Sequence, residues 1–472
     1  MSKILMLSSE VAPFVKTGGL GDVMGSLPAA LARAGEQVSV VMPRYRGLDA
    51  PDFYRLHERL PVWLNGFCHM VDIYACDREG VRYLFVNAPW FFDRDGVYSF
   101  HGKDWGDNHV RYAILCLAAL AIAREIDMPD VLHAHDWQAA LAPVYLKTWY
   151  ANDPRLLKLK TVLTIHNLGY QGRFAPHVMN ELGLDQNLFN HEQLEFHGDV
   201  NMLKGGIVFA DRLTTVSPTY AREIQTAEYG FGLDGLLRAR CNELSGILNG
   251  VDYGEWNPAT DLFLAANYTP EDLSGKQACK RDLLQQFGLP PEAMDRPLIG
   301  IVSRFAEQKG FDLIEHAAGA LGDEPMSMVV LGSGNPHWEK MFRQLSTWRP
   351  DKFGTWIGFS NELAHKIEAG SDIFLMPSRY EPCGLNQIYS LKYGTPPVVR
   401  ATGGLDDTID METGFKFRDY NAAGLLWAVR QAIQAWFQRD TWQDRMQRGM
   451  RKDFSWDQSA GKYSDLYRQL LT

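Results

Sequence analysis

The sequence is poor in the residues that would hold a disulfide framework or a zinc ion. Six cysteines are scattered along 472 residues, and none forms a Cys-x-x-Cys pair. A disulfide-stabilised fold is therefore unexpected in so long a chain, and the usual spacing of a zinc site is missing. No apolar run reaches the length of a transmembrane helix, which argues against a membrane partner.

Positive charge is also in short supply. The chain has 47 basic and 57 acidic residues and a formal net charge of −10. A nucleic-acid partner is disfavoured, because neutralising a phosphate backbone requires a basic surface. A local basic pocket for one small anion is compatible with this balance, and so is a neutral polymer such as a polysaccharide. The sequence does not indicate the oligomeric state.

Residues 1–7 lead directly into an apolar, strand-like segment. Because this segment has no features of a signal or transit peptide, we expect a cytoplasmic protein. Hydrophobic residues make up 46% of the chain and charged residues 22%, which is typical of a globular protein. A chain of 472 residues is too long for one ordinary core, so two domains are predicted.

Short apolar runs alternate with helical periodicity in both halves of the chain. This alternation predicts an α/β protein with mostly parallel sheets and right-handed crossovers. In the first half we expect strands at residues 3–8, 37–42, 81–87, 131–135, 161–166 and 212–216, and helices at 23–34, 110–126 and 138–150. In the second half we expect strands at 298–303, 326–331, 352–357, 372–377 and 397–400, and helices at 314–320, 362–370 and 385–393.

The boundary between the halves is expected near residues 245–260. The alternation restarts after Asn249-Gly250-Val251-Asp252, and residues 257–272 have the composition of a linker. We therefore predict a first Rossmann-like domain at 1–245 and a second at 246–455. Two facing doubly wound sheets would hold ligands in the interdomain cleft, at the carboxyl ends of their strands.

A glycine-rich loop with one lysine follows the first predicted strand. Gly18 and Gly19 let the backbone approach an anion, and Lys16 adds a positive charge beside the start of the next helix. For the loop alone, a plain strand-to-helix turn is an equally good interpretation. A dinucleotide fingerprint is a weak rival, because the second strand ends in Pro43-Arg44 and not in an acidic residue. No P-loop motif occurs in the chain.

Polar groups end two later strands of the first half. His133-Ala134-His135-Asp136-Trp137 ends one of them, and its two histidines could share a face and suggest a metal. Further ligands are missing at any recognisable spacing, so Asp136 or Trp137 is favoured as a sugar contact. His166 ends the next strand, where α/β sheets bind ligands, with a structural histidine as the alternative. Asp93-Arg94-Asp95 resembles a metal-binding D-x-D motif, but a turn is preferred.

Two cations follow the first strand of the second half. Arg304 and Lys309 lie directly after this strand, so both can reach its carboxyl end. Arginine can bind a phosphate through two N–H groups, and lysine supplies a compact charge. The alternative is an ordinary surface ion pair with Glu307.

A further candidate segment joins a later strand to a helix. Glu381 could bind sugar hydroxyls, and the amides of Gly384 and Leu385 could bind phosphate at the helix start. Cys383 has no base beside it in the sequence, so a packing or contact role is favoured over a nucleophile. Nearby, Thr402-Gly403-Gly404-Leu405 repeats the sequence of the first glycine loop, again between a strand and a helix.

Together these segments resemble the ADP-glucose-dependent glycogen synthases of bacteria and the starch synthases of plants. The resemblance runs nearly end to end, and the combination of motifs is specific although no single motif is. Beyond the segments above, it is carried by Asn201-Met202-Leu203-Lys204-Gly205-Gly206, Thr215-Val216-Ser217-Pro218-Thr219-Tyr220, Glu228-Tyr229-Gly230-Phe231-Gly232-Leu233 and Leu248-Asn249-Gly250-Val251-Asp252.

The resemblance implies a GT-B fold in which a C-terminal helix, here residues 456–472, crosses back to the first domain. It implies retaining transfer of glucose from ADP-glucose to the non-reducing end of an α-1,4-glucan, which elongates a glycogen primer. It also implies that neither a cofactor nor a bound metal takes part.

The resemblance further implies roles for individual residues. Lys16 and the amides of Gly18 and Gly19 would contact the donor phosphates, and Arg304 with Lys309 would neutralise the departing ADP. The residues implied to hold sugar hydroxyls are Asp22, Asp136, Asn167 and Glu381, with the main chain near His166 beside the anomeric carbon and Tyr98 at the sugar or acceptor end. The substrate-binding set is completed by Asn249, Phe359, Cys383, Gly384 and Leu385.

Three positions depart from the family pattern. Phe359 stands where a tyrosine often stacks on the base, so the ring remains but the hydroxyl is lost. Asn386 replaces a threonine, which puts a side-chain phosphate contact in doubt. Asp406 replaces a small residue, and no consequence follows from the sequence.

Three alternatives to this function stay open. A related enzyme could use UDP-glucose, and a phosphorylase would need a pyridoxal phosphate lysine site, whose motifs are absent. A non-catalytic glucan-binding or regulatory protein would have little reason to combine Lys16, Arg304, Lys309 and Glu381.

Overall fold

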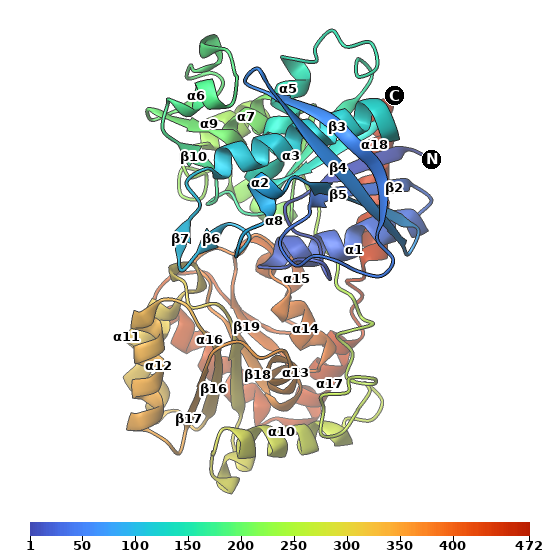
Figure 1. The fold of residues 1–472 in the computed structure, drawn as a ribbon. Coiled ribbons are helices and arrows are strands. Elements are labelled where there is room, and N and C mark those ends of the chain that lie inside the picture. The colour runs from blue at the N-terminus through green and yellow to red at the C-terminus, as the bar shows by residue number, and fades with distance from the viewer. The chain divides into compact units, whose positions relative to one another are not determined.

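The computed structural model describes all 472 residues, and the chain divides into two compact units (Figure 1). The N-terminal unit contains Met1–Val216, Ala221–Gly250 and Trp456–Thr472. The C-terminal unit contains Ser217–Tyr220 and Val251–Ser455. The last helix of the chain therefore belongs to the N-terminal unit, and the main change of unit, after Gly250, falls a few residues beyond the predicted boundary at 245.

A nine-stranded sheet forms the centre of the N-terminal unit, in the order β14-β13-β9-β8-β1-β2-β5-β4-β3. The strands from β14 to β5 are parallel, whereas β4 runs antiparallel to both β5 and β3. The strands are β1 Lys3–Leu7, β2 Gln37–Pro43, β3 Tyr54–Leu64, β4 Phe67–Arg78, β5 Val81–Asn87, β8 Val131–His135, β9 Lys160–Ile165, β13 Arg212–Thr215 and β14 Leu244–Gly246.

Short strands and helices complete the N-terminal unit. A two-stranded sheet pairs β6 Ser99–Phe100 with β7 Lys103–Asp104, and a three-stranded sheet contains β10 Arg173–Phe174, β11 Glu195–Phe196 and β12 Asp199–Asn201. The helices are α1 Gly19–Arg33, α2 Pro89–Phe92, α3 Asn108–Ile122, α4 Asp136–Ala139, α5 Leu141–Lys147, α6 Val178–Glu181, α7 Met202–Phe209, α9 Asp234–Ala239 and α18 Trp456–Leu471, with α8 Pro218–Glu223 at a change of unit. Helix α3 is buried along almost its whole length, which explains its nearly uninterrupted apolar sequence.

The strand order of this sheet reverses beside β1. From β1 the chain adds β2 and β5 on one side, and it later adds β8, β9 and β13 on the other. The segments that leave the carboxyl ends of β1 and β8 therefore diverge, and doubly wound sheets bind their ligands at such a position.

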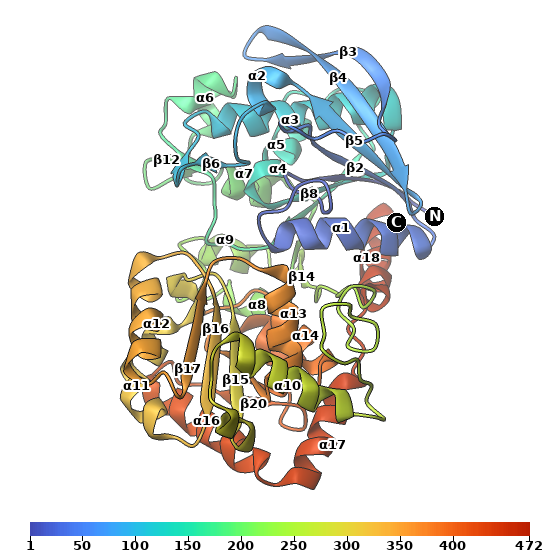
Figure 2. The same cartoon turned by 60° about the horizontal axis from the view of Figure 1, so that its bottom comes forward.

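Helix α18 packs against α1 within the N-terminal unit (Figure 2). Arg33 of α1 and Asp457 of α18 form an exposed ion pair of 3.1 Å. On the buried face of α18, the hydroxyl of Tyr467 lies 2.7 Å from Nδ1 of His133 on β8. The predicted return of the last helix to the first domain is thus built from specific buried contacts.

The C-terminal unit is a second doubly wound sheet with all six strands parallel, in the order β17-β16-β15-β18-β19-β20. The strands are β15 Leu298–Val302, β16 Ser327–Gly332, β17 Phe353–Ile357, β18 Ile373–Met376, β19 Pro397–Arg400 and β20 Phe415–Phe417. The helices are α10 Ser274–Gln286, α11 Phe311–Asp323, α12 Pro336–Trp348, α13 Asn361–Gly370, α14 Asn386–Lys392, α15 Gly403–Thr408, α16 Ala422–Trp436 and α17 Arg439–Met450. Its strand order reverses between β15 and β18.

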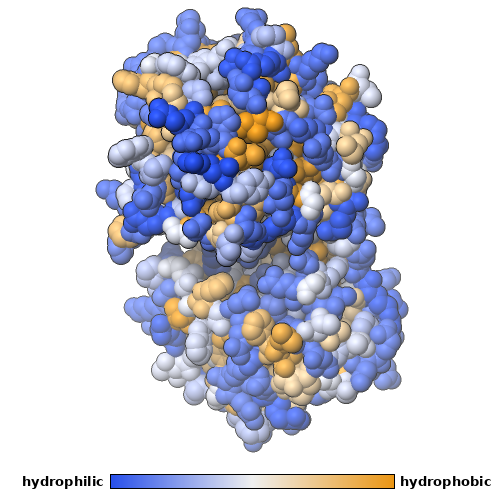
Figure 3. All heavy atoms as spheres, turned by 45° about the vertical axis from the view of Figure 1, so that its right-hand side comes forward, coloured by the Kyte–Doolittle hydropathy of each residue, from blue (hydrophilic) through white to orange (hydrophobic).

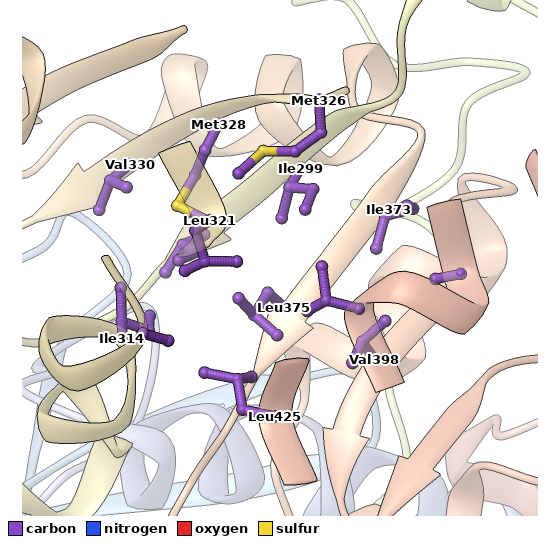
Figure 4. Packing of buried hydrophobic residues seen from close by; sticks show 14 of the residues in the cluster. Ile299, Ile314, Leu321, Met326, Met328, Val330, Ile373, Leu375, Val398 and Leu425 are labelled. Atoms are coloured by element: carbon purple, nitrogen blue, oxygen red, sulfur yellow. The ribbon is translucent and has the colours of Figure 1, made fainter. Parts of the chain in front are cut away.

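Two apolar cores cover the two faces of this sheet, and successive strand residues alternate between them. Met328 and Val330 pack on the side of α11, α12 and α16, whereas Val329 and Leu331 pack on the side of α10 and α13. Figure 4 shows side chains of the first core converging from strands and helices. Burial on both faces explains why these strands are continuous apolar runs without polar alternation.

One glycine sets the distance between sheet and helix. A Cβ atom at Gly300 would lie 2.3 Å from Oγ of Ser371 and 2.7 Å from Cγ2 of Ile367. Only glycine therefore allows α13 to lie so close to the central strand β15.

The strands expected from the sequence are confirmed, with ends that differ by one residue at most. The helix expected at 138–150 is divided into α4 and α5, because Pro143 cannot donate a hydrogen bond to the carbonyl of Ala139. The long hairpin of β3 and β4 was not expected. Its turn, Asn65-Gly66, has positive φ at both residues (48° and 77°), and this dipeptide is a strong hairpin signal.

The expected linker at 257–272 contains no helix or strand but is anchored in the C-terminal unit. The carboxylate of Asp261 is buried, 2.7 Å from Nδ1 of His365, and accepts a hydrogen bond of 2.5 Å from the hydroxyl of Tyr393. Trp256, just before this segment, stacks on His365 with ring centroids 3.8 Å apart. The segment is therefore a packed part of the unit.

The face shown in Figure 3 is mostly hydrophilic, with apolar patches between polar side chains. None of the helices combines the length and the apolar character needed to cross a bilayer.

We predict that Tyr467→Phe lowers the free energy of unfolding of the N-terminal unit by about 1–3 kcal/mol, because it leaves Nδ1 of buried His133 without its partner. Urea unfolding measures this change. Arg468→Ala, on the exposed side of the same helix, is the control and should stay within about 0.5 kcal/mol of the wild type. Equal stability of both variants would contradict the role given to the His133–Tyr467 contact.

Candidate active site

The glycine loop between β1 and α1 is open on its outer side. A Cβ atom added at Gly18 or Gly19 would meet nothing within 4 Å, so another molecule can approach the backbone there. Lys16 is half exposed, and its Nζ lies 2.5 Å from the carboxylate of Asp22 in the first turn of α1. Two predicted substrate-binding side chains thus form an ion pair with one another.

A buried glutamate that the sequence analysis missed lies behind this loop. Glu10 follows β1, and its carboxylate accepts hydrogen bonds from the backbone N–H groups of Thr17 and Gly18. It also accepts bonds from the hydroxyls of Thr17 (2.7 Å) and Tyr98 (2.5 Å). The Gly18 amide, which was predicted to contact a phosphate, therefore already donates its hydrogen bond to Glu10. A charged residue directly after a buried strand was the available signal.

Three histidine rings form a row across β8 and the end of β9, in which His133 and His135 are buried and His166 is partly buried. His133 and His135 do share a face, with ring centroids 4.2 Å apart. The nitrogens of His133 contact the hydroxyls of Tyr467 (2.7 Å) and Thr164 (2.6 Å), so this residue has a structural role. Nδ1 of His135 lies 3.0 Å from Nε2 of His166.

Burial keeps this row uncharged near neutral pH. It lowers the pKa of His133 and of His166 to about 3, and that of His135 well below its usual value. His166 can therefore act near pH 7 as a neutral hydrogen-bonding group or through its main chain, but not as a cation.

Asp136 connects the ends of β8 and β9. Its Oδ1 atom accepts a 2.7 Å hydrogen bond from the backbone N–H of His166. Its φ of 59° is unusual for a residue other than glycine, and such strain clusters at functional sites. Burial raises the pKa of Asp136 to about 7, and the negative charge of Glu10 adds to the rise. The carboxyl group is thus held beside the strand ends in a low-polarity setting.

The remaining predicted residues of the N-terminal unit differ in their hydrogen-bond partners. Tyr98 is bound to Glu10 and lies 2.7 Å from Oγ of Ser9. The side chain of Asn167 accepts a bond from the N–H of Gly169, beside His166. Asn249 is buried, and its Oδ1 atom has no partner in the chain. Asn249 is therefore the one predicted contact here with an unused buried polar atom.

An aromatic groove of about 420 Å³ lies beside Asp136 in the same unit. Its aromatic lining comes from Trp105, Trp137, Tyr170, Phe174 and Phe231, and its polar lining includes Asp104, Asn108, Gln171 and Arg173. Gly172 is required here, because a Cβ atom would lie 2.4 Å from the ring of Trp137. Flat rings with polar groups between them suit a ligand with apolar faces and hydroxyl edges. Of these residues, the sequence predicted only Trp137 as a ligand contact, whereas Phe231 lies in a motif that carries the family resemblance.

In the C-terminal unit, Lys309 and Glu381 meet at the carboxyl edge of β15 and β18. Nζ of Lys309 lies 2.7 Å from Oε2 of Glu381, and both side chains are largely buried. Oγ of Ser378 donates a second bond of 2.9 Å to the same oxygen. Arg304 is exposed at the end of β15. Two of the predicted catalytic residues are therefore in direct contact, and the third lies at the same edge.

The turn after Glu381 is held by the second glycine loop. Gly384 has a φ of 72°, and a Cβ atom at Gly403 or Gly404 would overlap the backbone oxygen of Glu381 or Cys383. The repeated Thr-Gly-Gly-Leu sequence does lie between a strand and a helix, as expected. However, it packs on its own chain and lacks the open side of the first loop. Cys383 is buried in this turn, as a packing role predicts.

Two of the three departures from the family pattern lie at this site. Phe359 follows β17, and 90% of its side chain is exposed, so its ring is free to stack on a ligand. The side chain of Asn386, at the start of α14, donates a 2.9 Å bond to the carbonyl of Val302 at the end of β15. It therefore braces the site and is not free to contact phosphate. Leu385 precedes this helix as its N-cap.

The D-x-D-like segment forms a turn held by ion pairs. Arg46 contacts Asp93 (2.7 Å) and Asp95 (3.1 Å), and Arg94 contacts Asp107 (2.6 Å). Nowhere in the chain do three or more histidine, cysteine, aspartate or glutamate side chains gather in a way that could hold a metal ion.

We predict that Asp136 makes stability fall as pH rises from about 4 to about 7. Its folded pKa of about 7 exceeds the usual aspartate value of 3.8, so the native chain binds the proton more tightly than the unfolded chain. The stability of Asp136→Asn, measured by urea unfolding across this range, should lack this decrease.

Asp211→Asn is the control, because the pKa of Asp211 is shifted in the opposite direction. Burial raises the pKa of Asp211, but hydrogen bonds from Lys147 and Thr161 outweigh burial and lower it below 3.8. The stability that this carboxylate contributes should disappear only as the solution becomes acidic. Parallel pH profiles of wild type and Asp136→Asn would refute the buried-acid assignment.

The chain matches two protein families, one in each half. Residues 3–239 match the starch synthase catalytic domain, and residues 286–449 match the glycosyl transferases group 1.

Curated relatives match almost the whole chain. It is 48% identical over 476 residues to the glycogen synthase of Koribacter versatilis (strain Ellin345), covering 99% of this chain and 98% of that protein. It is 50% identical over 479 residues to the glycogen synthase of Anaeromyxobacter sp. (strain Fw109-5), covering 99% of each.

Solved structures share the fold. The catalytic domain of starch synthase IV from Arabidopsis thaliana, described as bound to ADP and acarbose, is 33% identical with a TM-score of 0.90, covering 100% of this chain and 99% of that one. Sucrose-phosphate synthase from Thermosynechococcus elongatus has a TM-score of 0.63 at 18% identity, with the same coverage, and supports the fold alone. The chain therefore belongs to the glycogen and starch synthase family of two-domain GT-B glycosyltransferases.

Proposed function

We propose that the chain transfers glucose from ADP-glucose to the non-reducing end of an α-1,4-glucan, with retention at the anomeric carbon. Glucosyl transfer in glycogen or starch elongation is the activity of its family. The observation that carries the proposal is the Lys309–Glu381 pair beside exposed Arg304, at the switch point of the C-terminal sheet. ADP as the nucleotide is supported by the starch synthase neighbour, which is described as bound to ADP.

In this proposal the two cations stabilise the leaving group. The bond between the anomeric carbon and the phosphate oxygen breaks, and its electron pair leaves with ADP. Lys309 has three N–H donors, of which one serves Glu381, so two remain for phosphate oxygens. Arg304 can donate two parallel bonds. Because Glu381, which itself accepts a bond from Ser378, already holds Lys309, little reorganisation is needed when the charge develops.

The N-terminal unit would serve the sugar and the acceptor. The carboxyl of Asp136 and the main chain at His166 would contact the transferred glucose, and the aromatic groove would hold the glucan chain. The acceptor hydroxyl attacks the anomeric carbon from the face of the departing phosphate, which takes up the hydroxyl proton. A trapped glucosyl-enzyme would contradict this route. We propose that the reaction needs neither a cofactor nor a metal.

The experiment that tests the proposal measures nucleotide release. Purified protein is incubated with a glycogen primer and either ADP-glucose or UDP-glucose, and release of ADP or UDP is followed. We expect ADP release that depends on the primer. UDP release alone would show that UDP-glucose is the donor, and no release from either nucleotide sugar would refute the proposed function.

We predict that Lys309→Ala reduces kcat by about 100- to 1,000-fold, the usual effect of removing one transition-state donor, while the KM for glycogen stays near the wild-type value. Steady-state kinetics with ADP-glucose measure both. Lys416→Ala removes a similarly buried ion pair with Asp406 in the same unit and is the control. An increased KM for glycogen at unchanged kcat would argue against the assigned role.

We also predict that Tyr170→Ala raises the KM for glucan by a factor of about 2 to 10, the value of an aromatic contact of about 0.5–1.5 kcal/mol. Tyr170 lines the groove and is 56% exposed, so its removal should not disturb the core. Trp90→Ala, an exposed aromatic outside the groove, is the matched control. A change confined to the KM for ADP-glucose would show that the groove does not bind the acceptor.

A further inference from the structure

Glu10 is a buried charge with an unusually complete set of donors. It is 3% exposed, and four hydrogen bonds reach its carboxylate, all from the glycine loop and Tyr98. Oε2 accepts the N–H groups of Thr17 and Gly18, and Oε1 accepts the hydroxyls of Thr17 and Tyr98. Such a carboxylate organises its donors, because each bond to an ionised acceptor is stronger than a neutral one.

This carboxylate occupies the position that a bound anion would take behind the loop. Consecutive backbone N–H groups that converge on one point form an anion-binding nest, and here the nest of Thr17 and Gly18 is filled by Glu10. The groups that remain for an external phosphate are the amide of Gly19 and the ammonium of Lys16, which faces Asp22. The loop thus keeps its shape without a ligand and offers only part of its donors.

Tyr98 brings a second segment to the same carboxylate. It lies between α2 and β6, almost ninety residues from Glu10 in sequence, and its hydroxyl contacts both Glu10 and Ser9. The position of Tyr98 therefore depends on the same group that fixes the loop.

We propose that Glu10 is a positioning residue that holds the glycine loop and Tyr98 in one arrangement, so that Lys16 and the Gly19 amide are preset for the donor phosphates. This inference rests on the proposed function, in which the loop contacts the nucleotide sugar. It predicts that the loop and Tyr98 are energetically coupled through Glu10, because the hydroxyls of Thr17 and Tyr98 share one carboxylate oxygen as their acceptor.

The test uses Glu10→Gln in the full-length protein. Glutamine keeps the shape but has one acceptor oxygen and an NH₂ group, which would face N–H or O–H donors. We expect the KM for ADP-glucose and the Kd for ADP alone, measured by calorimetry, to rise about tenfold or more. The KM for glucan should change less. Asp127→Asn removes a comparably buried carboxylate near Lys3, at the opposite end of β1, and should leave both donor constants unchanged.

A double-mutant cycle tests the coupling. Tyr98→Phe should weaken ADP binding in the wild type but have little further effect in Glu10→Gln, because the shared acceptor is already lost. Additive effects, or equal effects of Glu10→Gln and Asp127→Asn, would overturn the proposal. If Glu10→Gln does not fold, Thr17→Val replaces it, because this change removes only the hydrogen bond from the Thr17 hydroxyl to Glu10. The double-mutant cycle of Thr17→Val with Tyr98→Phe then tests whether the loop and Tyr98 are coupled.

The ADP measurement also separates this inference from the proposed function. A wild type that binds ADP but transfers no glucose would refute the proposed function and leave Glu10 testable by calorimetry. A wild type that transfers glucose, with ADP affinity unchanged in Glu10→Gln, would refute the positioning role alone.

Discussion

Both units depend on one constraint, the reversal of strand order beside the first strand of a parallel sheet. Because the chain continues to one side of β1 and then to the other, the segments after β1 and β8 diverge, and so do those after β15 and β18. The glycine loop and Asp136 are placed by the first divergence, and Lys309 and Glu381 by the second. The chemistry at each edge follows from where the strands end.

At both edges a lysine forms an ion pair with a carboxylate of the same unit. Lys16 is paired with Asp22, and Lys309 with Glu381, although the second pair is far more buried. A buried carboxylate with two donors orients an ammonium for a later ligand, whereas an exposed pair can exchange partners at little cost. Lys309 is therefore the more rigid of the two phosphate candidates, and Lys16 the more adaptable.

The fold was largely predictable, because strands buried on both faces are continuous apolar runs and their polar ends mark the ligand edge. Arg304, Lys309 and Glu381 were found in this way. Glu10 was missed because four hydrogen bonds from Thr17, Gly18 and Tyr98 distinguish it from other glutamates. Tyr98 is distant in the sequence, so no local sequence pattern indicates that these donors meet at one carboxylate. The aromatic groove was missed for the same reason, since Trp105 and Tyr170 approach only in the folded unit.

The repeated Thr-Gly-Gly-Leu sequence shows how context decides the use of a motif. At the first copy, a buried glutamate takes the inner amides, and the outer side of Gly18 and Gly19 stays open. At the second, the backbone oxygens of Glu381 and Cys383 fill the space that a side chain at Gly403 or Gly404 would need. In both cases the glycines permit close approach, but the first loop leaves this space open to another molecule, whereas the chain itself fills it at the second. A glycine loop therefore identifies a binding site only when its free side faces solvent, and the sequence of the loop does not contain that information.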